Sequence, residues 1–213
     1  MSIERWNTQA DELFHRSPII PVMVIEHLED AVPLAKALVA GGLNVLEITL
    51  RTSCALKAIE KIIKEVPEAM VGVGTVVNSQ QLYQVQELGA KFAISPGAST
   101  RLLEVAAQNS IVFIPGVSSC SEVITAMDYG YRHFKFFPAE SLGGVSTLKS
   151  IAGPLQDVQF CATGGITESN FQSYLALPQV PCIGGSWVAP TKLIQRKDWD
   201  GISQICQRAL NQL

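Results

Sequence analysis

The sequence predicts an α/β protein folded as a (β/α)8 TIM barrel with an N-terminal helix. Eight short runs rich in β-branched and aromatic residues recur along the chain, and such runs are typical of buried strands. Their starts lie 20 to 26 residues apart, which leaves room for one strand and one helix in each step. Alternation of this kind forces a parallel sheet, and eight steps in 213 residues favour a closed barrel with short loops. Periodicity alone leaves an open doubly wound sheet as the competing arrangement.

The elements can be placed in order along the chain. A helix is expected over residues 4–15, ahead of the first strand. Apolar residues with helical spacing fill the segments between strands, for example from Leu56 to Val66 and from Leu82 to Leu88. The expected strands begin at residues 19, 44, 70, 92, 112, 134, 159 and 182.

Short polar residues and glycines mark the ends of the expected helices. A side-chain oxygen can satisfy the free N–H groups of a first turn, and glycine can end a helix in the left-handed conformation. The expected N-caps are Ser53, Asn78, Ser99, Ser119 and Thr167. The expected terminating glycines are Gly42, Gly89 and Gly130.

Composition excludes several classes of protein. The net charge of -3 and the absence of a Lys/Arg-rich run argue against a nucleic-acid partner. The most apolar early run has seven residues, far below the roughly 20 that cross a bilayer, and the first sixteen residues do not resemble a signal peptide. Five cysteines without C-x-x-C spacing indicate reduced thiols and a cytoplasmic location. No linker or composition break divides residues 1–213, so one domain is expected.

The second run carries polar residues on one side. Glu47, Thr49 and Arg51 share one parity, and the apolar residues between them share the other. In a barrel covered by helices the polar set must face the axis. Considered alone, Glu47 and Arg51 could instead be a solvated strand face or a structural ion pair.

The sixth run places a lysine among aromatic residues, in HFKFFPAE. Its alternation turns His133, Lys135 and Phe137 inward. The alternative for Lys135 is an ammonium group that reaches water along an aromatic surface. Burial disfavours the ammonium form, so an interior lysine is expected to have a lowered pKa and to present a neutral amine.

A neutral amine and a carboxylate together suggest covalent chemistry. The amine of Lys135 could attack a ketone and form a Schiff base, which accepts the electrons released when a neighbouring C–C bond breaks. Glu47 could move the protons if it lies within hydrogen-bond reach. No metal or other cofactor is expected, because His15, His27 and His133 fall in unrelated elements.

Glycine pairs follow the last two expected strands, in TGGI and GGSW. In barrels these two loops often bind phosphate through backbone N–H groups and a helix N-terminus. Ordinary turn glycine is the alternative for either pair alone. The candidate phosphate-site residues are Thr163, Gly164, Gly165, Gly184, Gly185 and Ser186. At the ends of earlier strands, Gly74 would let Thr75 reach the pocket, and Pro96 would shape one wall of it.

Six segments together resemble the bacterial 2-keto-3-deoxy-6-phosphogluconate aldolases over nearly the whole chain. They are LEITLRT (46–52), VGVGTV (71–76), FAISPG (92–97), FKFFPAE (134–140), TGGI (163–166) and IGGSW (183–187). The first and fourth segments are specific, whereas the glycine pairs alone would not be.

The resemblance implies a class I aldolase of the Entner-Doudoroff pathway, a cytoplasmic homotrimer that needs no cofactor. Its implied substrate is the phosphorylated keto acid, split into pyruvate and glyceraldehyde 3-phosphate, with 4-hydroxy-2-oxoglutarate as a second substrate. Lys135 resembles the Schiff-base lysine and Glu47 the general acid/base, and Arg51 and Thr75 are similar to residues that hold the pyruvate carboxylate. The remaining matches are pocket positions Pro96 and Phe137, substrate-end positions Thr163, Gly164 and Gly165, and phosphate positions Gly184, Gly185 and Ser186.

Some alternatives remain open at this point. An aldolase for the galactonate epimer is the nearest one, followed by an isomerase or epimerase with Glu47 as its base, and by a barrel that only binds an anionic metabolite. The chain also has Ala162 where many relatives have proline, which would leave the backbone before Thr163 less constrained.

Overall fold

The computed structural model describes residues 3–213, and its centre is one parallel sheet closed into a barrel. Hydrogen-bonded neighbours follow the order β5-β4-β3-β2-β1-β9-β8-β7-β6. The strands are β1 (Ile19–Met23), β2 (Val45–Thr49), β3 (Met70–Gly74), β4 (Phe92–Ile94), β5 (Val112–Ile114), β6 (Gly116–Val117), β7 (His133–Phe136), β8 (Gln159–Thr163) and β9 (Cys182–Gly185). The predicted barrel is confirmed, and the open doubly wound sheet is wrong.

The fifth expected strand is divided into β5 and β6. Pro115 lies between them and has no N–H group to donate to a neighbour. β5 pairs with β4, and β6 pairs with β7. The chain from 112 to 117 therefore completes the ring, and β5 and β6 together form one of the eight barrel strands.

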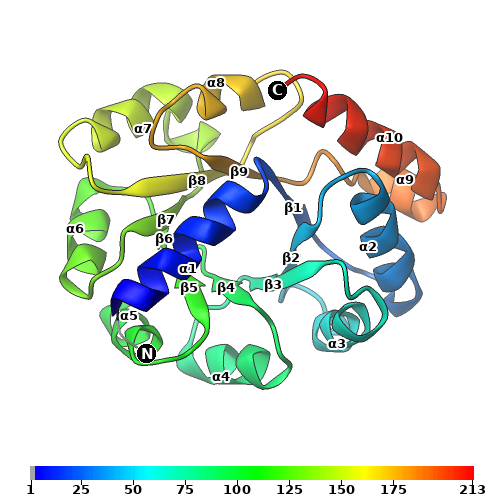
Figure 1. Ribbon diagram of the computed structural model, residues 1–213, viewed down its shortest axis with the longest axis horizontal. Coiled ribbons are helices and arrows are strands. Elements are labelled where there is room, and N and C mark those ends of the chain that lie inside the picture. The colour runs from blue at the N-terminus through cyan, green and yellow to red at the C-terminus, as the bar shows by residue number, and fades with distance from the viewer. Residues whose placement is uncertain (1–2) are drawn as a thin grey trace.

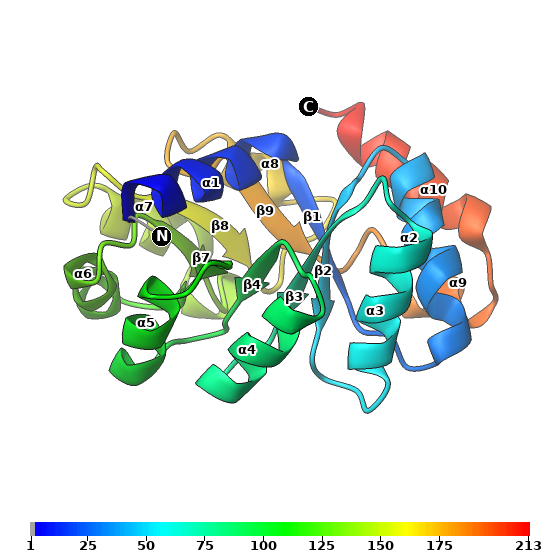
Figure 2. The same cartoon turned by 60° about the horizontal axis from the view of Figure 1, so that its bottom comes forward.

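Helices surround the ring of strands, and α1 (Ile3–Arg16) lies across one end of it (Figures 1 and 2). This confirms the helix expected at 4–15. The others are α2 (Ala31–Ala40), α3 (Ala55–Glu65), α4 (Ser79–Glu87), α5 (Thr100–Ala107), α6 (Cys120–Asp128), α7 (Gly144–Ala152), α8 (Phe171–Leu175), α9 (Thr191–Gln195) and α10 (Trp199–Leu210). Two short 3-10 helices are η1 (Leu28–Asp30) and η2 (Glu140–Leu142).

Aromatic residues of α1 close the end of the barrel that it covers. Trp6 and Phe14 are both buried, and their rings meet the His133 ring at centroid distances of 6.5 and 5.1 Å. Trp6 also packs edge-to-face on Tyr131 at 4.8 Å. Aromatic rings from α1 therefore cover the first residue of β7 at this end of the barrel.

Three of the five expected N-caps are confirmed. Asn78, Ser99 and Ser119 each accept a hydrogen bond from the backbone of the first helical turn. Ser53 and Thr167 are wrong, because Cys54 and Asn170 occupy the N-cap positions of α3 and α8. The three expected terminating glycines all have left-handed backbones, with φ of 95° at Gly42, 84° at Gly89 and 91° at Gly130.

Between residues 3 and 213, none of the helices combines the length and the apolar character that a membrane crossing requires.

Candidate active site

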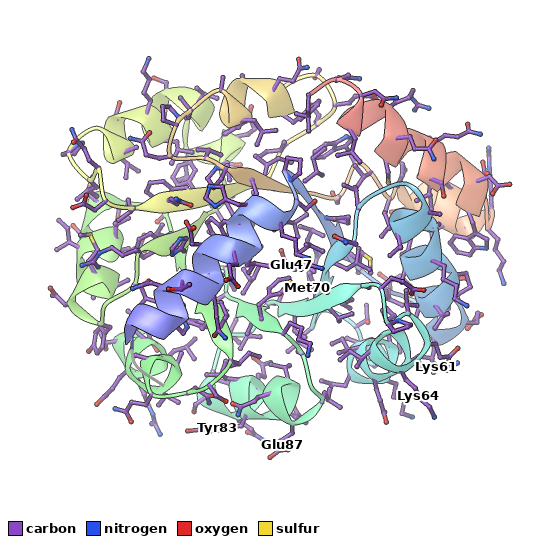
Figure 3. All side chains as sticks on the ribbon, in the orientation of Figure 1. Glu47, Lys61, Lys64, Met70, Tyr83 and Glu87 are labelled. Atoms are coloured by element: carbon purple, nitrogen blue, oxygen red, sulfur yellow. The ribbon has the colours of Figure 1, made fainter. Side chains whose placement is uncertain are left out.

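Lys135 and Glu47 meet inside the barrel. They come from β7 and β2, on opposite sides of the ring, and Lys135 Nζ donates to Glu47 Oε1 at 3.0 Å. Only 6% of Lys135 and 1% of Glu47 is exposed, and Figure 3 shows Glu47 within the ring of strands. The sequence alternatives of a solvated face for Glu47 and an outward-reaching Lys135 are therefore wrong. An amine and a carboxylate in direct contact away from water are a suitable pair for covalent chemistry with proton transfer.

Glycine on the neighbouring strand makes room for Glu47. β2 and β3 are in register with Thr49 opposite Gly74, and a Cβ at Gly74 would lie 2.1 Å from Glu47 Oε1. The sequence predicts that Gly74 gives Thr75 access to the pocket. The structure shows a second reason for glycine at this position, which is the space that the Glu47 carboxylate occupies. Any side chain at position 74 would displace the carboxylate from Lys135.

The second oxygen of Glu47 is free to accept a hydrogen bond. Oε2 is buried and has no hydrogen-bond partner among the described residues. Buried carboxylate oxygens nearly always have a partner, so an unpaired one points to a donor that arrives from outside the protein. A substrate hydroxyl is such a donor.

Two strands flank Lys135 in register, with Gly116 on one side and Cys161 on the other. The backbone of Pro96 passes close to Gly116, since a Cβ at Gly116 would lie 2.3 Å from the Pro96 carbonyl carbon. Phe137 lies near the amine, with its ring centroid 5.5 Å from Lys135 Nζ. Pro96 and Phe137 are both half-buried, as walls of an open pocket would be.

Buried thiols continue the same layer of the barrel. Cys161 lies in register with Cys182 on β9, and burial, with Cys161 next to it, raises the pKa of the Cys182 thiol well above its usual range. A thiol held in its protonated form is a poor nucleophile. Lys135 is therefore the better candidate for attack on a carbonyl.

Thr75 follows β3 in a left-handed backbone conformation. Its φ is 65°, which is uncommon for a β-branched residue, and its side chain is half-buried. Non-glycine residues in this region cluster at active sites and ligand clamps. Arg51 is exposed just beyond β2, where the Leu50 N–H bonds to the Gly74 carbonyl at 2.9 Å. Arg51 and Thr75 thus extend from adjacent strand ends.

The two glycine pairs lie side by side at the ends of β8 and β9. Thr163 is in register with Gly184, and a Cβ at Gly184 would lie 2.4 Å from Thr163 Oγ1. Gly164 and Gly165 have φ of 103° and 77°, which only glycine adopts without strain. This loop can present backbone N–H groups at the same end of the barrel as Phe137.

The second pair contains one glycine with a packing role. A Cβ at Gly185 would lie 1.7 Å from the Trp187 ring, so the turn needs glycine there whether or not a ligand binds. Ser186 is exposed beside it. α8 and α9 begin only at Phe171 and Thr191, several residues past the glycines. The prediction that a helix N-terminus adjoins the glycines is therefore wrong for both loops. An anion at these loops would contact their backbone N–H groups.

Ala162 is held within β8 by pairing on both sides. Its register partners are Phe136 of β7 and Ile183 of β9. Strand pairing therefore constrains the backbone before Thr163 without a proline.

A hollow also lies at the other end of the barrel, beneath α1. A cavity of about 640 Å³ is lined by α1 and by the starts of β3, β4 and β5, including Arg16, Met70 and Phe92. It contains neither Lys135 nor Glu47. Its size alone does not make it a reaction site, because no nucleophile and base are in contact there. Among the side chains from Trp6 onward, no group of three His, Cys, Asp or Glu residues could hold a metal ion.

Comparisons with known proteins agree over nearly the whole chain. The family described as KDPG and KHG aldolase matches residues 10–205. The chain is 53% identical to the KHG/KDPG aldolase of Escherichia coli, over 98% of each chain. It is 51% identical to the 2-dehydro-3-deoxy-phosphogluconate aldolase of Dickeya dadantii, again over 98% of each. A crystal structure of KDPG aldolase from Legionella pneumophila has pyruvate captured as a covalent carbinolamine intermediate. It superposes on this chain with a TM-score of 0.93 at 48% identity, and the match covers 96% of this chain and 99% of that chain. The chain belongs to the KDPG and KHG aldolase family.

Proposed function

We propose that this protein is a class I aldolase, a carbon-carbon lyase that cleaves 2-keto-3-deoxy-6-phosphogluconate (KDPG) to pyruvate and glyceraldehyde 3-phosphate, the aldolase step of the Entner-Doudoroff pathway. It also splits 4-hydroxy-2-oxoglutarate (KHG) to pyruvate and glyoxylate. The observation that carries the proposal is the buried contact of 3.0 Å between Lys135 Nζ and Glu47 Oε1. The relatives from Escherichia coli, Dickeya dadantii and Legionella pneumophila are named for the gluconate compound, so the galactonate epimer is not favoured as the substrate.

The first half of the reaction forms a bond at Lys135. The amine of Lys135, after it gives up a proton, attacks the C2 carbonyl to form a carbinolamine, which loses water to form a Schiff base. The covalent pyruvate adduct in the Legionella relative supports this route. Glu47 is close enough to supply and remove the protons.

The second half breaks the C3–C4 bond. Glu47 takes the proton of the C4 hydroxyl, the aldehyde forms, and the bonding electrons move to the Schiff-base nitrogen as an enamine. Protonation at C3 followed by hydrolysis releases pyruvate and restores the amine. The unpaired Oε2 of Glu47 is a suitable acceptor for the C4 hydroxyl.

The remaining candidate residues hold the two ends of the substrate. Arg51 and Thr75 bind the pyruvate carboxylate, since they extend from adjacent strand ends. Pro96 and Phe137 form the pocket walls. The phosphate meets the loops that contain Thr163, Gly164, Gly165, Gly184, Gly185 and Ser186.

The proposed protein is a cytoplasmic, single-domain homotrimer that acts without a cofactor. The uninterrupted sheet and common core support one domain. The exposed apolar side chains of Tyr83 and Ile124 support contacts between copies.

Borohydride trapping tests the proposal. Pyruvate and borohydride should reduce the adduct onto Lys135, and peptide mass spectrometry should locate it there. Lys135→Ala should lose both adduct and cleavage, whereas Lys149→Ala, at an exposed lysine of α7, should keep both. An isomerase with Glu47 as its base, or a barrel that only binds anions, would give no adduct. Cleavage that survives Lys135→Ala would refute the proposal.

A further inference from the structure

The loop after β8 is held by two side chains without an assigned role, Glu140 and Tyr174. Glu140 opens η2, shortly after the strand that carries Lys135, and Tyr174 lies in α8. The Tyr174 side chain is fully buried, and its hydroxyl donates a hydrogen bond to Glu140 Oε1. Burial, followed by the Glu140 carboxylate, raises the pKa of Tyr174, so its hydroxyl remains a donor at neutral pH.

Residues 139 and 140 contact each residue of the loop. The Ala139 N–H donates to the Thr163 carbonyl at 2.8 Å, and the Glu140 N–H donates to the Gly164 carbonyl at 3.0 Å. The Glu140 stem packs on the bare face of Gly165, since a Cβ there would lie 2.6 Å from Glu140 Cβ. The segment that continues from β7 therefore fixes one edge of residues 163–165.

The segment before α8 fixes the other edge. Asn170 Nδ2 donates to the Gly165 carbonyl at 3.2 Å, and its Oδ1 accepts from the Thr167 N–H at 2.8 Å. Gly144 leaves room for the central hydrogen bond, because a Cβ there would lie 3.0 Å from Glu140 Oε1 and 3.2 Å from the Tyr174 hydroxyl. The Glu140–Tyr174 hydrogen bond thus joins the two sides that enclose the loop.

We propose that Glu140 and Tyr174 are positioning residues that hold the backbone of residues 163–165 ready for the phosphate of the substrate. The inference rests on the proposed function, which places the phosphate at this loop. Glycine loses more conformational freedom on ordering than any other residue, so a loop with two glycines gains most from being fixed beforehand. A carboxylate would repel a phosphate dianion, so Glu140 acts through the backbone that it holds and not through contact with the ligand.

Two substrates that differ in the phosphate test the proposal. Tyr174→Phe removes the hydroxyl and keeps the ring. KM for KDPG should rise by roughly three- to tenfold, which is the loss of one hydrogen bond of ordinary net strength, and kcat should change by less than about twofold. KM for KHG, which has no phosphate, should change by less than about twofold. The inhibition constant of inorganic phosphate should rise by the same factor as KM for KDPG.

Variants at Glu140 separate positioning from charge. Glu140→Gln keeps an oxygen that can accept from Tyr174 and should stay near wild type, whereas Glu140→Ala should behave like Tyr174→Phe. Because Glu140 is exposed, its variants test the inference even if Tyr174→Phe does not fold. Tyr129→Phe, at a half-buried tyrosine that ends α6, is the matched control and should change neither KM.

The outcomes distinguish the two proposals. A wild-type protein that cleaves neither substrate would refute the proposed function. A wild-type protein that cleaves both, with Tyr174→Phe and Glu140→Ala raising both KM values equally or neither, would overturn only the role of Glu140 and Tyr174.

Discussion

At the scale of single residues, the two carboxylate oxygens of Glu47 have different surroundings. Its Oε1 accepts from Lys135, and its Oε2 is buried without a partner among the described residues. One carboxylate can therefore hold the amine and still receive a proton from the substrate. In the proposed mechanism Lys135 forms the bond to the substrate, and Glu47 transfers the protons.

Glu47→Gln should lower kcat by about 10² to 10⁴ while pyruvate binding changes far less. The amide keeps the shape of the side chain but cannot take the proton. Single-turnover kinetics and a pyruvate titration would separate the two effects. Glu60→Gln, at an exposed position of α3, is the control and should leave kcat unchanged. A normal turnover number in Glu47→Gln would remove Glu47 from its role.

The backbone of Thr75 makes a prediction about stability. At the φ of 65° found at Thr75, alanine has the steric energy cost of a left-handed backbone and glycine does not. Glycine offsets part of this advantage, because it loses more conformational entropy on folding. Thr75→Gly should therefore unfold with a free energy about 0.5 to 1 kcal/mol higher than Thr75→Ala, measured by urea denaturation. Both variants should bind pyruvate more weakly than wild type.

A matched pair in a helix provides the control for Thr75. Thr125 lies within α6, where glycine should be about 1 kcal/mol less stable than alanine. The order of the two variants should therefore reverse between the two sites. If alanine is the more stable variant at both, position 75 is not left-handed.

At the scale of elements, the contact between α1 and β7 makes stability depend on pH. Burial lowers the pKa of His133, although the hydrogen bond and charge of Asp11 raise it in part, and His15 lowers it further. His133 Nε2 lies 3.5 Å from Asp11 Oδ1, and its Nδ1 is buried without a partner among the described residues. Protonation of this ring therefore costs more in the folded protein than in the unfolded chain.

The direction follows from linkage. Because the folded pKa of His133 lies below 6.5, the unfolded chain binds more protons as pH falls from about 6.5 toward the folded value. The free energy of unfolding should therefore fall over that range, and His133→Gln should lose less of it than wild type. Urea denaturation at pH 7.5 and 5 measures this, with His27→Gln, an exposed histidine, as control. Equal losses in wild type and His133→Gln would contradict the prediction.

The elements also show how far the sequence predicts the fold. The eight strands and their order follow from spacing, because one strand and one helix are all that 20 to 26 residues can form. The break at Pro115 did not follow, since an apolar run with a proline can bend or be an edge strand. Ser53 and Thr167, which were wrongly predicted as N-caps, do lie near the starts of α3 and α8. Which of several polar residues caps a helix depends on where packing lets the first turn begin.

The site was predictable where alternation determines direction. Glu47 and Lys135 alternate with apolar neighbours, so their inward orientation could be read from the sequence. The hydrogen bond between Glu140 and Tyr174 could not, because its residues lie in two short helices 34 positions apart, whose packing against each other no sequence pattern states. The room that Gly74 leaves for Glu47 also depends on strand register, which the sequence does not state.

At the scale of the whole molecule, charge is unevenly spread over the ring of helices. α3 carries lysines and glutamates along its outer face, and Figure 3 shows Lys61 and Lys64 projecting from it. α4 has one charged residue, Glu87, and its Tyr83 is 51% exposed. Ile124 on α6 is exposed to the same degree. Exposed large apolar groups are typical of interfaces, so the side of the ring where Tyr83 of α4 and Ile124 of α6 are exposed, with α5 between the two helices, is where copies of the proposed homotrimer would meet.

Tyr83→Lys combined with Ile124→Lys should weaken that assembly. Buried aromatic and apolar side chains supply much of the binding energy at such contacts, so the concentration needed for assembly should rise at least about tenfold. Light scattering after size-exclusion chromatography would show the mass fall toward one chain of 23.0 kDa. Lys61→Glu, on the charged flank of α3, should leave the mass unchanged. If the double variant keeps the wild-type mass, copies meet through another face. If the wild-type protein itself has the mass of one chain, the trimer proposal fails. The proposed chemistry at Lys135 would not be affected, because Lys135 and Glu47 both lie within one barrel.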